Sequence, residues 1–384
     1  MRSYRVFIAL LLSIVASPAV AAPVDTDAIG LETSNFSPAP RSPLEKRDFA
    51  NQVVFTPPST YTSWKTIYGR SAQVADGSLL VTWEDYPLVD QTPFPIYRST
   101  DGGVTWASYS QILDQVNGWG MRYQPHLYVL PTAFGGFAAG TVLCAGVSAP
   151  SDLSEAYIDL YASTNSGLTW KFVSHIAYGS GPELASNGDA AIWEPFFLMY
   201  GSTLICYYSD QRDPAHGQKL TYQTTTNLVS WGGAVDVVAD PTYSHRPGMA
   251  IVSYLASINL YFLTFENCTS SCLATYRWSS SPYTFNSAPS TLLAPSTGSN
   301  PGNAPFHIYY KGKIYLNAAQ SSSVYVNTAG TTVWTPVDVG QIESYTRCLE
   351  IIKVGGVDKL LITSAGEMSS TFNNYVSVAV VTPP

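Results

Sequence analysis

The sequence repeats one local pattern six times: an apolar strand, a tight turn and a second apolar strand. The first copy runs from Arg70 to Glu84 and turns at Asp76 and Gly77. Each copy begins at a polar residue, 44 to 70 positions after the previous one, and these residues are Arg70, Gln124, Glu194, Arg246, Asn303 and Arg347. Such a spacing is typical of a four-stranded propeller blade with its loops. We therefore predict an all-β fold, a six-bladed β-propeller.

A shorter motif lies between the copies and supports the same fold. Residues Ser99 to Trp106 fit the Asp-box pattern Ser-x-Asp-x-Gly-x-Thr-Trp, and Ser163 to Trp170 repeat it with Asn165 in place of the aspartate. An Asx side chain and a glycine stabilise a tight hairpin, and the tryptophan anchors this hairpin to its blade. We therefore interpret Asp101 as a structural residue on the outer side of a blade.

A propeller must close its ring, because an open ring leaves sheet edges exposed. The sixth copy supplies only three good strands, the last of them between Asn374 and Val381. The segment from Gln52 to Phe55 is a further strand candidate, just before the first copy. We predict that this segment pairs near Val53 with the strand around Val378 and completes the sixth blade. A β-sandwich would not explain six recurrences of one unit.

The N-terminal part of the chain is typical of an exported protein. Arg2 and Arg5 precede an apolar run from Val6 to Val15, and small residues follow at positions 19–21. This pattern predicts a signal peptide, and the dibasic pair Lys46-Arg47 indicates a processing site. The predicted parts are a signal peptide at 1–21, a propeptide at 22–47 and a secreted, extracellular propeller at 48–384.

Composition excludes several classes of partner. The 384 residues include 19 basic and 27 acidic side chains, without a basic run, which argues against nucleic acid. No stretch after the signal peptide reaches the ~20 apolar residues of a membrane span. The five histidines are scattered, so we expect no metal or cofactor. Among the five cysteines, Cys268 and Cys272 are the pair that we expect to form a disulfide, in a chain that we expect to be a monomer.

The polar residues that open the six copies indicate a common site. The inner strands of all blades begin around one axial pocket, so residues at these positions point into it or lie close to it. Burying polar groups is costly unless they pair or bind a ligand. We therefore predict that the pocket binds its substrate through Arg70, Gln124, Arg246, Asn303 and Arg347.

Two carboxylates in this set indicate the chemistry. Glu194 opens the third copy, and Glu266 ends the second strand of the fourth copy, in the neighbouring blade. Hydrolysis of a glycosidic bond needs two such groups, one as acid/base and one as nucleophile or base. A separation of about 5 Å gives retention of configuration, whereas about 6.5–9.5 Å gives inversion.

These features resemble glycoside hydrolase family 93, fungal secreted exo-1,5-α-L-arabinanases with a six-bladed, sialidase-type propeller. The resemblance rests on the Asp-boxes, on Trp193-Glu194-Pro195, on residues 246–249 (Arg-Pro-Gly-Met) and on Glu266, and it covers nearly all of residues 48–384. It implies a retaining enzyme that releases arabinobiose from the non-reducing end of linear arabinan. It also implies that Glu194 and Glu266 are catalytic, and we assign Glu194 as acid/base and Glu266 as nucleophile. The chain departs from the family just after Glu266, where a short cysteine loop follows.

Two alternative functions remain open from the residues. A sialidase of the same superfamily would hold a carboxylate with three arginines. Its residues would be Arg70, Arg246 or Arg212, and Arg347, with Tyr375 as nucleophile and Asp85 or Asp90 as acid. The first copy lacks the Arg-Ile-Pro sequence typical of sialidases. The other alternative is an inactive propeller that binds glycans through its tryptophans and tyrosines.

Overall fold

The computed structural model describes residues 47–369 and 373–384, which form six four-stranded antiparallel sheets. In five of these blades, blades 1 to 5, the four strands follow one another along the chain. Blade 1 contains β2 (Thr66–Gln73), β3 (Leu79–Asp85), β4 (Phe94–Ser99) and β5 (Ala107–Ile112). Blade 2 contains β6 (Gly120–Val129), β7 (Val142–Ala149), β8 (Ala156–Ser163) and β9 (Lys171–Gly179). Blade 3 contains β10 (Ile192–Tyr200), β11 (Thr203–Asp210), β12 (Lys219–Thr225) and β13 (Val235–Val238).

Blades 4 and 5 follow the same order, whereas blade 6 combines both ends of the domain. Blade 4 contains β14 (Arg246–Leu255), β15 (Leu260–Cys268), β16 (Cys272–Ser279) and β17 (Thr291–Leu292), with a 3₁₀ turn at Phe285–Ser287. Blade 5 contains β18 (Phe306–Tyr310), β19 (Lys313–Asn317), β20 (Val324–Thr328) and β21 (Thr335–Val337). Blade 6 contains β22 (Cys348–Val354), β23 (Val357–Ser364), β24 (Val376–Val381) and β1 (Phe49–Phe55).

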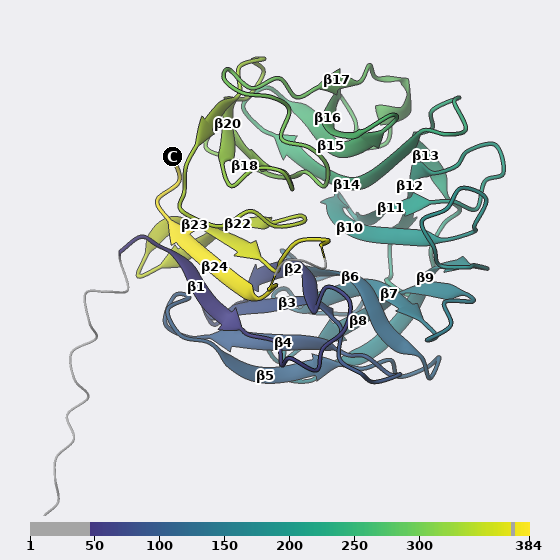
Figure 1. The fold of residues 1–384 in the computed structure, drawn as a ribbon, viewed down its shortest axis with the longest axis horizontal. Coiled ribbons are helices and arrows are strands. Elements are labelled where there is room, and N and C mark those ends of the chain that lie inside the picture. Colours follow the sequence, from purple (N-terminus) through teal and green to yellow (C-terminus); the bar gives the residue numbers. More distant parts are fainter. Residues whose placement is uncertain (1–46, 370–372) are drawn as a thin grey trace, which may run out of the picture. The chain divides into compact units, whose positions relative to one another are not determined.

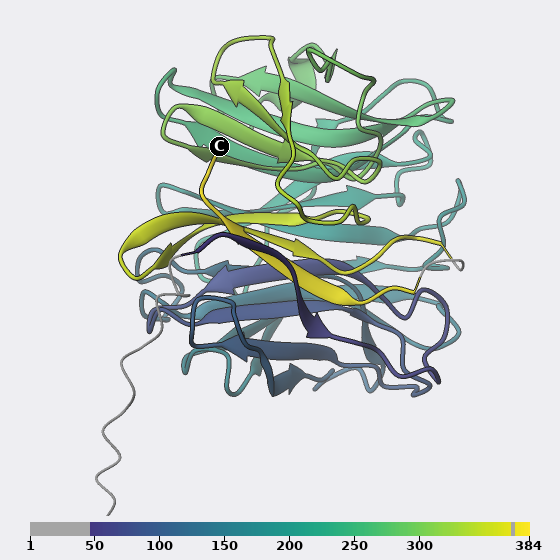
Figure 2. The ribbon, with the colours of Figure 1, turned by 60° about the vertical axis from the view of Figure 1, so that its left-hand side comes forward.

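The six blades form a closed ring (Figure 1). The inner strands contact one another in the order β2, β6, β10, β14, β18 and β22, and β22 contacts β2 again. The last blade closes through β1, which pairs with β24 so that Gln52 lies opposite Val378 and Val53 opposite Ser377 (Figure 2). The predicted six-bladed fold and its closure by the two ends of the domain are therefore confirmed. The predicted signal peptide and all but the last residue of the predicted propeptide lie outside the described residues.

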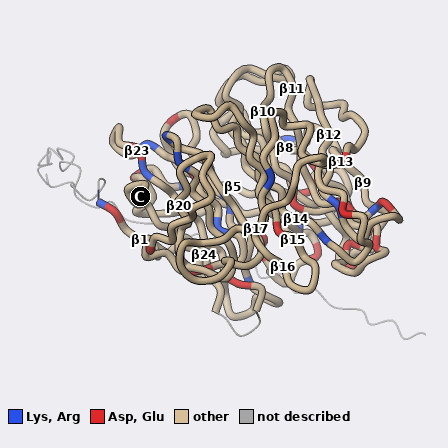
Figure 3. Tube along the Cα trace, turned by 90° about the horizontal axis from the view of Figure 1, so that it is seen from above, with Lys and Arg blue, Asp and Glu red and all other residues tan. Residues whose placement is uncertain are grey.

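The interior is filled by apolar side chains, both between the blades and near the axis. Six clusters of buried residues pack between neighbouring sheets, and one of them brings Phe196, Ile251 and Phe306 of three inner strands together. Charge is sparse, and most of the chain carries neither a basic nor an acidic residue (Figure 3). Within the described part of the chain, no helix is long and apolar enough to cross a membrane.

The two Asp-box hairpins use the same hydrogen bonds. Asp101 Oδ1 accepts from the backbone N–H of Thr105 at 2.9 Å, and Asp101 Oδ2 accepts from the Thr105 hydroxyl at 2.6 Å. In the second hairpin Asn165 Oδ1 accepts from the backbone N–H of Thr169, and its Nδ2 donates to the Thr169 hydroxyl. Asparagine therefore replaces aspartate without loss of a hydrogen bond to the threonine.

Each inner strand has one equivalent residue with a left-handed backbone, either within the strand or two positions before it. These six residues have φ angles between 49° and 63°, and they are Tyr68, Gln124, Glu194, Met249, Ala304 and Thr346. Such angles are uncommon outside glycine, and in the first four blades the strand pairing shifts register at this point. We call them the bulge residues. They occupy equivalent positions in the six blades. The sequence predicts six polar residues at equivalent positions, and only two of them, Gln124 and Glu194, are bulge residues.

Candidate active site

A cavity of about 290 Å³ lies where the inner strands begin. Its walls come from blades 1, 2, 3, 4 and 6, together with loops that follow β7, β9 and β23. The lining includes four of the predicted site residues, which the structure brings together here: Gln124, Glu194, Arg246 and Glu266. Aromatic residues complete much of the wall, namely Trp64, Tyr86, Tyr123, Trp193 and Tyr345.

Glu194 is held from its own blade and from the next one. Its Oε2 accepts from the Ser209 hydroxyl at 2.6 Å, on the adjacent strand β11. The same oxygen accepts from the backbone N–H of Met249 at 2.8 Å, across the junction to blade 4. Glu194 is itself the bulge residue of blade 3, so its φ of 63° turns the side chain out of the regular alternation of the strand. Two donors therefore stabilise its charged form.

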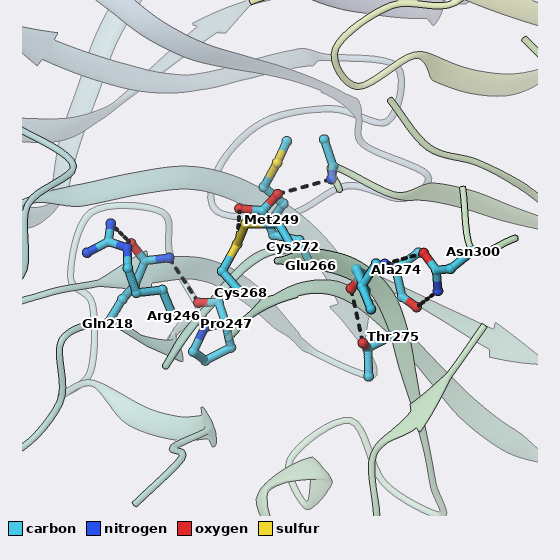
Figure 4. Close-up of a disulfide and its surroundings, with 12 residues drawn as sticks. Gln218, Arg246, Pro247, Met249, Glu266, Cys268, Cys272, Ala274, Thr275 and Asn300 are labelled. Carbon is cyan, nitrogen blue, oxygen red and sulfur yellow. Dashed lines mark hydrogen bonds between the residues drawn. A yellow bond between two sulfur atoms is a disulfide. The ribbon is translucent and has the colours of Figure 1, made fainter. Parts of the chain in front are cut away.

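Glu266 has a different set of neighbours, although it also bridges two blades. Its Oε2 accepts from the backbone N–H of Ala304 at 3.0 Å, and Ala304 is the bulge residue of blade 5. Its Oε1 lies 3.8 Å from the sulfur of Cys268 (Figure 4). That sulfur is bonded to Cys272, so the cysteine loop after Glu266 is a disulfide that packs against this carboxyl group.

Gly248 lies between the two carboxyl groups. A Cβ atom built on this residue would lie 3.2 Å from Glu266 Oε1 and 3.4 Å from Glu194 Oε2. The two oxygens therefore lie less than about 7 Å apart, which excludes all but the lowest end of the separations found in inverting enzymes. A side chain at this position would fill the space between them, so glycine keeps the gap open.

Burial raises the pKa of both carboxyl groups. The pKa of Glu266 rises to about 8, first because burial disfavours its charge and then because Glu194 repels it. The pKa of Glu194 also rises through burial, opposed by the hydrogen bonds from Ser209 and Met249 and by the charge of Arg246. The site therefore holds at least one proton near neutral pH.

Arg246 is the cation that lines this cavity. Its two terminal nitrogens donate to Asn187 Oδ1 at 2.7 Å and to Gln218 Oε1 at 2.8 Å. Gln218 in turn donates to the backbone carbonyl of Pro247, which keeps the guanidinium beside Gly248 (Figure 4). The positive charge favours the ionised forms of Glu194 and Glu266.

Sequence reasoning missed two further carboxyl groups in this wall. Glu84 is 2% exposed, and burial raises its pKa to about 7. Glu183, on the loop before β10, accepts from the backbone N–H of Ile192, and burial raises its pKa to about 9. Glu84 could have been found from the repeat, because it ends the second strand of its copy as Glu266 does.

Three predicted substrate-binding residues need correction, because they do not line this cavity. Arg70 is 3% exposed, and its guanidinium lies 3.9 Å from the ring centre of Tyr68. Arg347 is fully buried and donates to the backbone carbonyls of residues 321–323. Asn303 precedes the bulge residue Ala304 by one position. Arg70 and Arg347 come after the bulge residues of their blades, and the cavity wall there comes instead from Ile67 and Tyr345, which come directly before those bulge residues.

The residues of the sialidase alternative are dispersed. Tyr375 lines a different cavity, together with Glu343 and Glu367. Arg212 forms an ion pair with Asp210 at 2.7 Å. Arg347 binds backbone carbonyls, so within the described part of the chain no cluster of three arginines faces the carboxylate pair. Burial also raises the pKa of Tyr345, one of three tyrosines in the pocket, well above its usual value, so this phenol stays protonated.

The Asp-box tryptophans lie outside the pocket, as predicted for structural residues. Trp170 packs into the cluster between blades 1 and 2, and its Nε1 donates to the Ser110 hydroxyl on β5. Trp106 packs against the cluster between blades 6 and 1. Among the described residues, no group of three or more His, Cys, Asp or Glu side chains is arranged to hold a metal ion.

Several solved structures share this architecture. No protein-family model and no curated protein matches the chain. Among solved structures, an α-L-arabinanase of Penicillium chrysogenum, complexed with arabinobiose, is 41% identical with a TM-score of 0.84, over 88% of this chain and 98% of that one. An α-L-arabinofuranosidase of Fusarium graminearum, also seen with arabinobiose, is 39% identical with a TM-score of 0.83, over 87% and 98%. A protein of unknown function from Dyadobacter fermentans shares the fold alone, at 10% identity and a TM-score of 0.59.

A six-bladed propeller with two carboxyl groups converging near its axis is the arrangement expected of a propeller-type glycoside hydrolase. The two fungal enzymes match this chain over 87–88% of its length and 98% of their own. The chain belongs to glycoside hydrolase family 93.

Proposed function

We propose that this enzyme is a secreted exo-hydrolase that cleaves α-1,5-linked L-arabinan with retention of configuration and releases arabinobiose. The observation that carries the proposal is the convergence of Glu194 and Glu266 on Gly248, in a chain 39–41% identical to enzymes that were seen with arabinobiose. The N-terminal pattern of residues 1–21 supports secretion.

The shape and charge of the cavity support this substrate. A volume of about 290 Å³ is at the lower end of small-ligand sites, so it suits a chain end better than a long stretch of polymer. The wall contains four carboxyl groups, two of them buried, and one arginine, which favours a neutral sugar over an acidic one. An anionic sugar would be repelled by the ionised carboxylates. The sialidase alternative is therefore disfavoured.

The hydrogen-bond donors support roles for the two glutamates in the reverse of the order expected from the sequence. Glu194 Oε2 receives two donors, whereas Glu266 Oε2 receives one. The carboxylate that accepts more hydrogen bonds keeps its charge more easily, so Glu194 acts as the nucleophile. Glu266, with a pKa of about 8, keeps the proton that a general acid must donate.

The two steps then follow from this geometry. Glu194 attacks the anomeric carbon while Glu266 protonates the departing glycosidic oxygen, which gives a covalent glycosyl-enzyme. Glu266, now ionised, removes a proton from a water molecule that attacks the same carbon and releases Glu194. The Ser209 hydroxyl and the Met249 N–H keep the attacking carboxylate in place. Two inversions give net retention.

Azide rescue tests both the pair and its order. Glu266→Ala should slow hydrolysis of linear arabinan about 10²- to 10⁴-fold, and azide should restore turnover of an activated aryl arabinofuranoside with an α-configured azide as product. Glu194→Ala should lose at least about 10⁴-fold, and azide should give the β-configured product by direct displacement. Product configuration is read by NMR.

The pH dependence of kcat/KM is an independent test of the two roles. The general acid must be protonated, so kcat/KM should fall as the pH rises through about 8, the pKa of Glu266. In Glu266→Ala this alkaline limb should disappear for an aryl substrate that needs no acid. An α-azide from Glu194→Ala would reverse the roles, and wild-type activity of both variants on arabinan would refute the pair.

A further inference from the structure

Glu84 occupies in blade 1 the position that Glu266 occupies in blade 4. Glu84 pairs with Ile67, the residue before the bulge residue of its blade, and Glu266 pairs with Gly248 in the same way. Each then accepts from the backbone N–H of the bulge residue in the following blade. The distance is 2.9 Å from Gln124 N to Glu84 Oε1 and 3.0 Å from Ala304 N to Glu266 Oε2. Blades 1 and 4 lie half a turn apart in the ring (Figure 1).

Packing of the blades does not require a carboxyl group at this position. Other blades carry smaller or apolar side chains there. Val147 and Ser209 pair with the residue before the bulge residue in blades 2 and 3, and Ala319 donates its N–H to that residue in blade 5. Burial of a charge is costly unless it binds something. Glu84 is 2% exposed in a chain with only 12% charged residues, so its presence at the pocket needs a reason beyond blade packing.

The remaining hydrogen-bonding capacity of Glu84 faces a ligand site. Its Oε1 accepts from Gln124 N, and its Oε2 accepts from the Tyr86 hydroxyl at 2.8 Å. A carboxylate oxygen accepts two hydrogen bonds, so both oxygens retain an acceptor position. Gln124 Oε1 is also buried and has no partner. Glu84, Tyr86 and Gln124 all line the same cavity as the catalytic pair.

We propose that Glu84 and Gln124 form a sugar-binding clamp that accepts hydrogen bonds from hydroxyl groups of the arabinofuranose residue at the reaction centre. The proposal rests on the proposed function, because it assigns the groups that hold that substrate. Acceptors on this wall select ligands with hydroxyl donors and leave an unpaired buried oxygen when a donor is missing. A site built to bind a hydroxyl group discriminates most strongly against ligands that lack this group.

The first test compares Glu84→Gln and Glu84→Ala with Glu350→Gln. Glu350, on β22, also accepts a backbone N–H from the next blade, at 2.8 Å from Gln73 N, and burial also raises its pKa to about 7. It does not line the pocket, so it is a matched structural control. On an aryl arabinofuranoside, Glu84→Ala should lower kcat/KM about 10- to 100-fold, mainly through KM, and Glu84→Gln should recover part of the loss. Glu350→Gln should keep the wild-type KM.

The second test uses monodeoxy analogues of the aryl arabinofuranoside. With the wild-type enzyme, at least one analogue should lose about as much kcat/KM as Glu84→Ala does. With Glu84→Ala, that analogue and its parent should react equally, because the shared hydrogen bond is already gone. Equal discrimination by the wild type and the variant, or an equal KM change in Glu350→Gln, would overturn the clamp. A wild-type enzyme without turnover of any arabinoside would overturn the proposed function and the clamp with it.

Discussion

At the scale of single residues, the pocket depends on backbone N–H groups that neighbouring blades supply to buried carboxylates. Met249 N reaches Glu194, Ala304 N reaches Glu266, and both donors belong to bulge residues. A left-handed residue points its N–H away from the strand ladder, so the group is free to bind across the junction. Each carboxyl group is thereby fixed by a blade other than its own, which gives the pair its rigidity.

Gly248→Ala tests the gap between the two carboxyl groups. The added Cβ would lie 2.9 Å from Gln218 Nε2 and 3.2 Å from Glu266 Oε1, so at least one of these groups must move. A displacement of about 1 Å at a reaction centre costs about 100-fold in kcat/KM. Steady-state kinetics on linear arabinan should show this loss. Gly233→Ala is the control, because its Cβ would meet nothing within 4 Å and activity should not change.

At the scale of the element, the hairpins and the disulfide have different tasks. The second Asp-box hairpin attaches blade 2 to blade 1, since Trp170 donates to Ser110. Outside the two Asp-boxes, Trp231 of blade 3 likewise donates to Ser174 of blade 2. The Cys268–Cys272 disulfide joins β15 to β16 directly after Glu266. The Asp-box hairpins stabilise the outer rim, and the disulfide fixes the end of the strand that carries Glu266.

Asp101→Ala should destabilise the first Asp-box hairpin without affecting the pocket. The change removes the acceptor of two backbone N–H groups and two hydroxyls, and we expect a loss of about 1–2 kcal/mol. Asp101→Asn should be nearly neutral, because Asn165 makes the equivalent contacts in the second hairpin. Thermal unfolding checks both variants, and a raised KM in either would contradict the structural role.

At the scale of the whole molecule, the ring is closed by residues more than 320 positions apart in the sequence. Strand β1 pairs with β24, and Phe55 stacks on Trp83 of blade 1 at 5.1 Å between ring centres. This strand therefore seals both the sixth sheet and the junction to the first. Without it, two apolar sheet edges would be exposed.

Val54→Asp should destabilise the whole domain in one transition. Val54 is 7% exposed in the junction between blades 6 and 1, so a buried carboxylate there should cost about 3–5 kcal/mol. Val53→Asp is the matched control, because Val53 is 47% exposed and should change stability by less than about 0.5 kcal/mol. Chemical denaturation followed by tryptophan fluorescence measures both variants. Equal stability of the two would show that closure does not depend on this strand.

The sequence alone determined the features that depend on local pattern. Six copies of one strand pair predict six blades, and the missing strand predicts closure by the segments around Val53 and Val378. Both predictions are possible because the alternation of apolar residues and the spacing of the copies can be read directly from the sequence. Glu194 and Glu266 could be selected for the same reason, as acidic residues at the ends of inner-blade strands. The placement of Val53 and Val378 requires only the periodicity of strands, whereas a bulge directs the side chain of Glu194.

Only the tertiary structure decided which polar residues face the pocket. A bulge shifts strand register and reverses the faces of the residues around it, and no local signal marks it at Tyr68, Met249 or Thr346. Arg347 therefore binds backbone carbonyls inside the fold, while Glu84 lines the cavity. The order of roles that we propose for the two glutamates rests in the same way on N–H donors from neighbouring blades, which meet the carboxylates only after the ring has closed.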